Sequence, residues 1–317
     1  MSRSDPYLIV ALADAHRARK QLPSGTLATL IAEFKRSAEF ATRAPKTRKA
    51  YERYLAIIQK RFGTMPIAVV QDKRSRGDFK AWRDTFSDKP RTADYLWQTL
   101  ARVLSVAKDN GRIANNVCER GGRLYEANRA EIIWEGRHIA AMGASASKPL
   151  CLALILALWT GQREGDLLRL PWSAYDGTHI KLRQRKTGAR VRILCGEPLR
   201  VALDAAANNK TSTTILANSR GRSWTEDGFR TSWGRAAEKA GVEGRRFHDL
   251  RGTAVTRLAK AGCTVPQIAA ITGHSTKDAE TILDAHYLGG RIELAEAAIV
   301  KLEMHEKRTE LANRSAN

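Results

Sequence analysis

The sequence predicts a mainly α-helical protein of two domains with one small β-hairpin. Three observations favour this fold class. The chain has 317 residues, which at roughly 150 residues per domain favours two domains, each large enough for its own core. Apolar residues recur at helical spacing through much of the first half of the chain. Period-two alternation, which indicates a strand, is convincing only between Ile180 and Ile193.

Three stretches of the first half carry apolar residues three and four positions apart, and each predicts a helix. Thr47 is a suitable N-cap for the second helix and Gly63 ends it, while Asp109-Asn110-Gly111 ends the third. The three apolar stripes are Leu27, Leu30, Ile31 and Phe34; Tyr51, Tyr54, Leu55, Ile58 and Phe62; and Leu96, Leu100, Val103, Leu104 and Ala107.

The second half is expected to mix helices with the hairpin. Lys148-Pro149 opens an apolar helix that ends at Thr160-Gly161, and a short helix follows from about Arg163 to Leu170. Two alternating runs then flank Lys186-Thr187-Gly188-Ala189, which predicts a hairpin with a lysine at its tip. Helices return from about Trp224. Apolar residues at helical spacing also predict a helix from about Arg291 to Glu306.

Composition places the domain boundary and excludes several classes of protein. The polar, glycine-containing segment from Gly111 to about Ala130 separates a helical domain, 25–125, from a second domain, 130–317, and residues 1–24 form an N-terminal extension. The longest apolar run, Leu150 to Trp159, is half of what a bilayer crossing needs. The four cysteines are widely separated, and neither C-x-x-C nor H-E-x-x-H occurs, so we expect no metal and no disulfide framework. The chain is expected to be cytoplasmic.

The charge balance indicates the partner. Lysines and arginines outnumber acidic residues by 54 to 33, a formal net charge of +21. An excess of this size in a protein without a membrane segment favours nucleic acid. The hairpin carries six basic residues and no acidic one. They form either a solvated face or a surface laid against DNA, and Arg183, Arg185 and Arg190 are the candidates for DNA contact.

Three further segments carry side chains suited to phosphate chemistry. Arg163 begins a helix, where free N–H groups already favour anions, and Asp166 one turn later could hold its guanidinium. His248 and Arg251 are three positions apart on an expected helix, so an imidazole and a guanidinium share a face. The third segment is Thr272-Gly273-His274-Ser275, followed by Tyr287, which is the only tyrosine after Tyr175.

This order of motifs (Arg163, Lys186, His248 with Arg251, Gly273-His274, Tyr287) resembles that of the tyrosine recombinases, the phage integrase family. The resemblance spans 130–290, and the basic helical residues 25–125 are similar to that family's core DNA-binding domain. It implies a two-domain DNA clamp, with a helical core-binding domain and a mixed α/β catalytic domain. Two positions depart from the family pattern: glycine follows Arg251, and the spacer between His274 and Tyr287 is longer than usual, so an extra helical turn or a loop must accommodate it.

The resemblance also implies a role for each candidate residue. Arg163 and Arg251 would clamp the scissile phosphate, and Tyr287 would attack phosphorus to form a 3′-phosphotyrosyl bond. Lys186, on a mobile hairpin tip, would protonate the leaving 5′-oxygen. His248 would assist proton transfer and His274 would hydrogen-bond the phosphate. With two arginines supplying positive charge, neither a metal nor another cofactor is required.

The expected partner is double-stranded DNA with inverted half-sites, bound by a homotetramer that holds two duplexes, with accessory DNA-bending proteins as further partners. In that assembly the helix near Arg291 to Glu306 would dock on the neighbouring protomer; alternatively, it folds back on its own domain. Two other functions stay open. One is a type IB topoisomerase, which relaxes DNA with the same chemistry. The other is a regulator in which Gln267 to Leu283 forms a helix-turn-helix.

Overall fold

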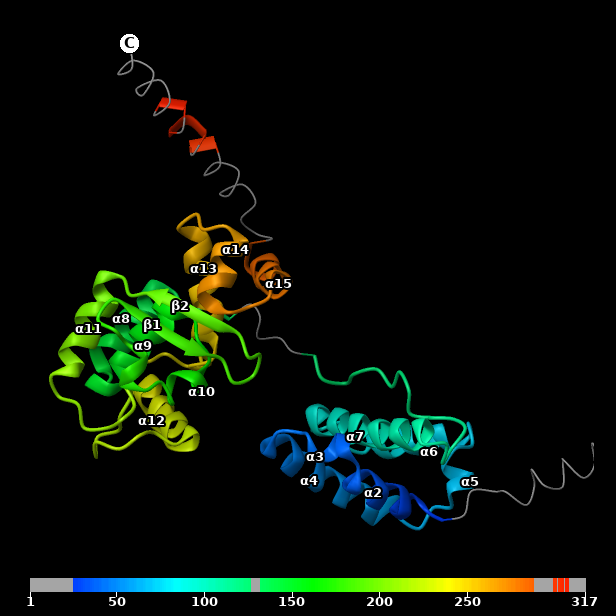
Figure 1. Cartoon of the computed structure of the whole chain (residues 1–317). Helices are drawn as coiled ribbons and strands as arrows, with labels where there is room; N and C mark the ends of the chain where they lie inside the picture. The colour runs from blue at the N-terminus through cyan, green and yellow to red at the C-terminus, as the bar shows by residue number, and fades with distance from the viewer. Residues whose placement is uncertain (1–24, 127–131, 288–298, 301, 305, 308–317) are drawn as a thin grey trace, which may run out of the picture. The chain divides into compact units, whose positions relative to one another are not determined.

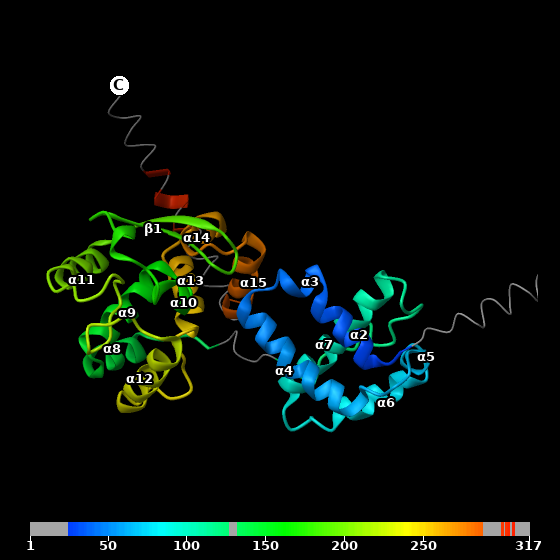
Figure 2. The same cartoon turned by 60° about the horizontal axis from the view of Figure 1, so that its bottom comes forward.

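A computed structural model describes residues 25–126, 132–287, 299–300, 302–304 and 306–307, with only the backbone of 285–287. The chain divides into two compact units, residues 1–126 and 127–317. The described residues are mostly helical, with one antiparallel sheet of two strands (Figures 1 and 2), which confirms the predicted fold class. The expected N-terminal extension, 1–24, lies outside the described residues.

The regular elements described in the first unit are all helices. The three predicted apolar stripes lie on α2, α4 and α7, and all of their members are buried except Tyr51, which is half-buried. Burial of one face of each helix therefore forms this core. The helices are α2 (Leu27–Arg36), α3 (Ala38–Ala41), α4 (Pro45–Phe62), α5 (Ile67–Val70), α6 (Ser75–Asp84) and α7 (Pro90–Asp109).

The start of α4 differs from the expected one. Thr47 lies inside the helix, which begins at Pro45 with Ala44 as its N-cap. Proline suits the first helical position because its fixed φ is already helical and its missing N–H would have no partner there. The helix therefore starts two residues before the expected N-cap, at Pro45.

The second unit is built around one apolar helix. Figure 1 shows α9 among the helices of this unit, and it packs against α8, α10, α11 and α13. Leu150, Leu154 and Leu158 are buried, as an all-apolar helix requires. The helices are α8 (Gly136–Ser145), α9 (Lys148–Thr160), α10 (Glu164–Leu167), the 3₁₀ turn η1 (Trp172–Ala174), α11 (Glu197–Ala207), α12 (Glu226–Lys239), α13 (Asp249–Lys260), α14 (Val265–Thr272) and α15 (Thr276–Tyr287).

The hairpin forms where it was predicted, with β1 at His179–Arg183 and β2 at Arg190–Leu194. Ile180 and Ile193 are partners in the register and both are buried. The connection runs over 184–189, two residues longer than expected at its start. The hairpin lies beside α14, which contacts β2 (Figures 1 and 2).

Three helices after the hairpin form a small group of their own. α13, α14 and α15 pack together around Val255, Ile268 and Ala279. The order of α14, a turn at Gly273 and α15 matches the helix-turn-helix considered for a regulator. Helix α11 was not predicted, since helices were expected to return only from about Trp224. Its buried stripe consists of Leu199 and Leu203 alone and is hard to recognise in the sequence.

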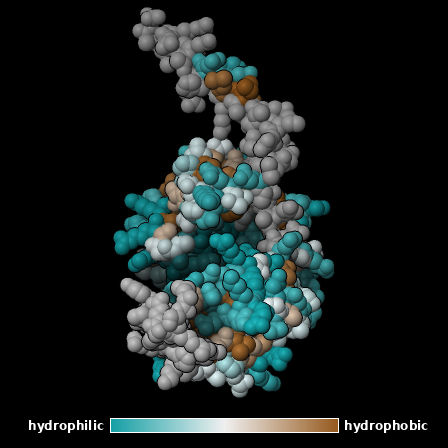
Figure 3. Space-filling view, turned by 90° about the vertical axis from the view of Figure 1, so that its right-hand side faces the viewer, coloured by the Kyte–Doolittle hydropathy of each residue, from teal (hydrophilic) through white to brown (hydrophobic). Residues whose placement is uncertain are grey.

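The helix expected near Arg291 to Glu306 lies largely outside the described residues. Those of its positions that are described are helical, and the side chains of Ile299 and Leu302 are exposed. Among the described residues, no helix is long and apolar enough to cross a membrane. The face drawn in Figure 3 is mainly hydrophilic, with apolar side chains in small scattered areas.

Candidate active site

Arg163 lies at the junction between α9 and α10. Gly161 ends α9 with a φ of 61°, a left-handed conformation that glycine adopts without strain, and Arg163 is the N-cap of α10. The guanidinium of Arg163 donates through Nη1 to Oε1 of Gln184. Asp166, the expected partner, instead accepts the backbone N–H of Arg185 at 3.1 Å. The prediction that Asp166 holds Arg163 was therefore wrong, because Gln184 of the hairpin loop provides the acceptor for Arg163.

Arg251 is the most constrained side chain of the cluster. It lies in the first turn of α13 and is 5% exposed. Its Nη1 donates to the carbonyl oxygens of Gly161 at 2.6 Å and Thr272 at 2.8 Å, and its Nε donates to Nε2 of His274 at 3.0 Å.

The remaining nitrogen of this guanidinium, Nη2, is buried and has no hydrogen-bond partner among the described residues. Burial, followed by the positive charge of Arg163, lowers the pKa of Arg251 to about 9. A buried cation with one unsatisfied N–H group, placed beside a second cation, is costly, and a bound anion would remove that cost. The pair of arginines is thus arranged for an anionic ligand.

His274 follows the left-handed Gly273 in the turn between α14 and α15. The hydroxyl of Thr272 donates its proton to the carbonyl of Ile268 at 2.7 Å, so it accepts from Nδ1–H of His274 at 2.9 Å. Nε2 of the ring is then the unprotonated nitrogen that accepts from Arg251. This geometry assigns a neutral ring whose two nitrogens are both occupied, so His274 supports Arg251 here and has no nitrogen left for a phosphate.

The charge state of His274 predicts a pH dependence of stability. Burial, then the charges of Arg251 and Arg163, lowers its pKa to about 4, against which the carboxylate of Asp278 acts in the opposite direction. As the pH falls from about 6.5 to about 4, the unfolded chain binds a proton that the folded ring does not, so stability is lost in that window. His274→Asn should reduce this loss. We expect a smaller fall in melting temperature between about pH 7 and about pH 5 than in the unsubstituted protein, and an equal fall would contradict the assignment.

His248 immediately precedes α13 as its N-cap, rather than lying within the helix as expected. His248 is an exposed residue. Partial desolvation, and then the charge of Arg251, lowers its pKa, and Arg163 and Lys186 act in the same direction. Each of these cations therefore lies near enough to His248 to disfavour a positive charge on its ring. A neutral imidazole is suited to accept a proton near neutral pH.

Lys186 is exposed in the loop between β1 and β2. The base of this loop is not free. Gln184 is 1% exposed, its backbone N–H donates to the carbonyl of Ala189 at 2.8 Å, and its side chain contacts Arg163. The loop whose tip the resemblance describes as mobile is therefore anchored at its first residue, Gln184.

The three arginines proposed to contact DNA are all exposed. Arg183 and Arg190 are directly opposite each other across the two strands, and Lys181 and Arg192 form a second pair of like charge. Like charges in these positions destabilise a hairpin by themselves. Lys181 is compensated by Asp176 at 3.0 Å. A polyanion laid on this face would offset the remaining repulsion.

Tyr287 is the last residue of α15, and its side chain lies outside what the structure describes. The long spacer after His274 is occupied by this helix. At 1.5 Å per residue, the backbone of Tyr287 lies about 16 Å along the helix from Thr276. The residues that lengthen the spacer between His274 and Tyr287 therefore form helical turns.

Two other features complete the description of this unit. Among the described residues, no group of three histidine, cysteine, aspartate or glutamate side chains could hold a metal ion.

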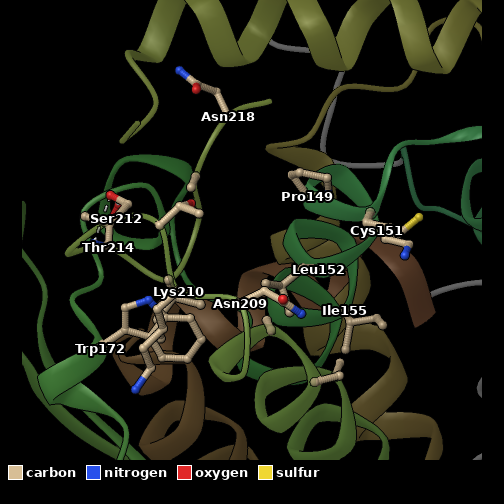
Figure 4. A pocket seen from close by; sticks show the side chains of 17 residues that line it. Pro149, Cys151, Leu152, Ile155, Trp172, Asn209, Lys210, Ser212, Thr214 and Asn218 are labelled. Carbon is tan, nitrogen blue, oxygen red and sulfur yellow. Dashed lines mark hydrogen bonds between the residues drawn. The ribbon is translucent and has the colours of Figure 1, made fainter. Parts of the chain in front are cut away.

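A pocket of about 530 Å³ lies between the start of α9, the end of α11 and the segment that follows α11 (Figure 4). Trp172 and Lys210 line it, with the ammonium of Lys210 4.8 Å from the centre of the indole ring. None of the candidate catalytic residues lines this pocket.

Sequence reasoning missed the residues that hold the two arginines in place. They are Gln184 and Thr272, both of which are buried. A signal for Gln184 was available, because it continues the inward-facing positions of Ile180 and Leu182 at a spacing of two. A polar residue on the buried face of a strand requires hydrogen-bond partners and so indicates a site.

A helical unit in which two arginines, two histidines and a lysine-bearing hairpin loop converge is the arrangement expected of a tyrosine recombinase catalytic domain. The family model described as the phage integrase family matches residues 136–283. The second unit of this chain belongs to that family.

Two phage integrases of known sequence are similar to this chain. The integrase of Escherichia phage HK022 is 30% identical over 165 residues, 51% of this chain and 44% of that protein. The integrase of Mycobacterium phage L5 is 25% identical over 219 residues, 62% of this chain and 59% of that protein. The chain thus spans about half the length of these relatives.

Two solved structures share the fold. A lambda integrase (75–356) dimer bound to a COC′ core site matches with a TM-score of 0.72 and 22% identity, covering 84% of this chain and 97% of that one. The Tn1549 transposon integrase in complex with a circular intermediate DNA matches with a TM-score of 0.69 and 20% identity, covering 86% and 100%.

Proposed function

We propose that this protein is a site-specific tyrosine recombinase that cleaves and rejoins double-stranded DNA through a 3′-phosphotyrosyl intermediate. The observation that carries the proposal is Arg251, a buried guanidinium with one unpartnered nitrogen beside Arg163. Such a pair favours an anion whose charge increases during reaction, as at a phosphate under attack.

The proposed step assigns each proton and bond. The phenol oxygen of Tyr287 attacks phosphorus, and its proton passes to a base, for which the neutral His248 is suited. The bond from phosphorus to the 5′-oxygen breaks, and Lys186 protonates that oxygen. Arg163 and Arg251 bind the non-bridging oxygens. His274 holds Arg251 in this scheme. The phosphotyrosyl bond retains the energy of the broken bond, so rejoining needs no ATP.

The hairpin supplies the proposed DNA contact through Arg183, Arg185 and Arg190, whose cations replace counterions of the backbone. By analogy with the lambda integrase, of which a tetramer bound to a Holliday junction is known, we extend the proposal to a homotetramer on two duplexes with inverted half-sites. Accessory DNA-bending proteins, a cytoplasmic location and docking of the helix near Arg291 to Glu306 on the neighbouring protomer belong to the same proposal. So does the assignment of 25–125 to core-site binding and 130–317 to catalysis.

The proposal is tested by covalent capture. The protein is incubated with a pool of randomised duplexes that carry a nick, so that cleavage near the nick releases a short fragment and traps the adduct. Protein–DNA adducts that survive denaturation are recovered and sequenced. We expect one enriched site containing an inverted repeat. Absence of any adduct would instead indicate a regulator, and relaxation of a supercoiled plasmid without strand exchange would indicate a topoisomerase.

Lys186→Ala provides a test of the leaving-group proton. We expect cleavage of the captured site to slow by about 10²- to 10⁴-fold, the usual contribution of a general acid. A substrate with a 5′-bridging phosphorothiolate has a leaving group that needs no proton, so cleavage of it should be nearly unaffected. Single-turnover rates on the two substrates measure the difference. If the sulfur substrate is cut equally slowly, Lys186 contacts the backbone only.

A further inference from the structure

One buried amide connects the segments that carry the proposed catalytic groups. Oε1 of Gln184 accepts from Nη1 of Arg163 and from the hydroxyl of Thr187 at 2.8 Å. Its Nε2 donates to Oε1 of Gln162 and to the carbonyl of Thr272, both at 2.7 Å. The oxygen meets only donors and the nitrogen only acceptors, so the orientation of the amide is fixed and its full hydrogen-bonding capacity is used.

The backbone around this amide is shaped to admit it. Gly273 has a φ of 65°, and a Cβ atom there would lie 2.4 Å from Nε2 of Gln184. Only glycine therefore allows the amide to reach the end of α14. The carbonyl of Thr272 that Gln184 contacts also accepts from Arg251. The same amide thus touches Arg163 directly and Arg251 through one shared acceptor.

We propose that Gln184 is a positioning residue that fixes the guanidinium of Arg163 and the base of the Lys186 loop relative to each other. This inference rests on the proposed function and names a residue that acts through its neighbours, without touching DNA. A neutral amide suits the task because its oxygen orients Arg163 without cancelling the charge that a phosphate requires. A carboxylate in its place would form an ion pair with Arg163 and compete with the ligand.

Gln162 offers a matched control. It is 2% exposed and belongs to the same network, donating to the carbonyl oxygens of Thr160 at 3.1 Å and Ile271 at 2.9 Å. Unlike Gln184, it makes no hydrogen bond with Arg163 in the described structure, and it meets the loop only where its Oε1 accepts from Nε2 of Gln184. Gln184→Met and Gln162→Met each remove one buried amide, but only the first removes the contact with the proposed catalytic groups.

The decisive measurement is single-turnover cleavage of the captured site together with its binding constant. We expect Gln184→Met to slow cleavage about 10²-fold, since small misplacements of reacting groups have effects of this size, with binding within about twofold. On the phosphorothiolate substrate, Gln184→Met should recover only the part of the cleavage rate that is lost through misplacement of Lys186. Gln162→Met should slow cleavage less than about fivefold, even if its melting temperature falls as far as that of Gln184→Met. Gln184→Glu, which keeps the shape, should be as slow as Gln184→Met because it pairs with Arg163.

Equal slowing in Gln184→Met and Gln162→Met, in proportion to the loss of melting temperature, would overturn the proposal and leave a structural role only. Hydrogen exchange of the Gly188 and Ala189 amides gives a readout that needs no activity. We expect faster exchange in Gln184→Met and not in Gln162→Met. If the unsubstituted protein forms no adduct but this exchange difference is present, the proposed function fails while the anchoring of the loop holds. Unchanged exchange overturns the anchoring in either case.

Discussion

Tyr287→Phe is expected to abolish the covalent adduct while DNA binding is retained. The substitution removes one hydroxyl oxygen, the only atom of this residue that can attack phosphorus, and changes no charge. The arginines proposed to bind phosphate and the basic hairpin stay intact, so the affinity for the captured site should change by less than about twofold. Adduct formation is measured on the nicked duplex after denaturation, and binding by a mobility shift on the same DNA.

Tyr175→Phe is the matched control, because Tyr175 and Tyr287 are the only tyrosines beyond residue 131. The hydroxyl of Tyr175 donates to Asp204 at 2.8 Å, and burial, then this carboxylate, raises its pKa to about 12. It is therefore engaged and hard to ionise, and its loss should leave adduct formation unchanged. An adduct formed by Tyr287→Phe but not by Tyr175→Phe would move the nucleophile to Tyr175 and overturn the assignment.

The apolar patterns predicted most of the fold because burial leaves a periodic trace in sequence. The stripes on α2, α4 and α7 and the all-apolar α9 are buried as expected. Helices with a weak trace were harder to predict. Helix α11 buries only Leu199 and Leu203, and α5 and α6 in the first unit were not identified at all. The exact start of a helix was also hard to predict, because several nearby residues can favour one. Thr47 was the expected N-cap, but α4 begins at Pro45.

The candidate site was predictable as a set of residues but not as a network. Spacing alone suggested that Asp166 holds Arg163, since residues three apart on a helix are neighbours. In the structure Arg163 is the N-cap, outside the helix, and the acceptor comes from the distant Gln184. Contacts between segments far apart in the chain leave no periodic signal. For the same reason, the partnership of His274 with Arg251 could not be derived from the sequence.

Arg251→Lys is expected to reduce cleavage by about 10³-fold or more, although the positive charge is kept. The guanidinium of Arg251 donates to the carbonyl oxygens of Gly161 and Thr272 and to the ring of His274, and its Nη2 has no partner among the described residues. An ammonium has only three donors around one atom and cannot reproduce this planar geometry. Loss of one donor at a developing charge typically costs about 10²–10³ in rate, and misplacement of the remaining donors adds to it.

The same change should lower stability, because buried acceptors left without a donor cost about 1–3 kcal/mol each. Arg163→Lys separates the two effects. Arg163 is only half-buried and donates to the single acceptor Gln184, so this variant should lose cleavage with little change in melting temperature. If both variants cleaved at the rate of the unsubstituted protein, a point charge would suffice and the planar arrangement around Arg251 would serve folding alone. If Arg251→Lys lost stability but not cleavage, the unpartnered nitrogen would have no role at the phosphate, and the observation that carries the proposed function would fall.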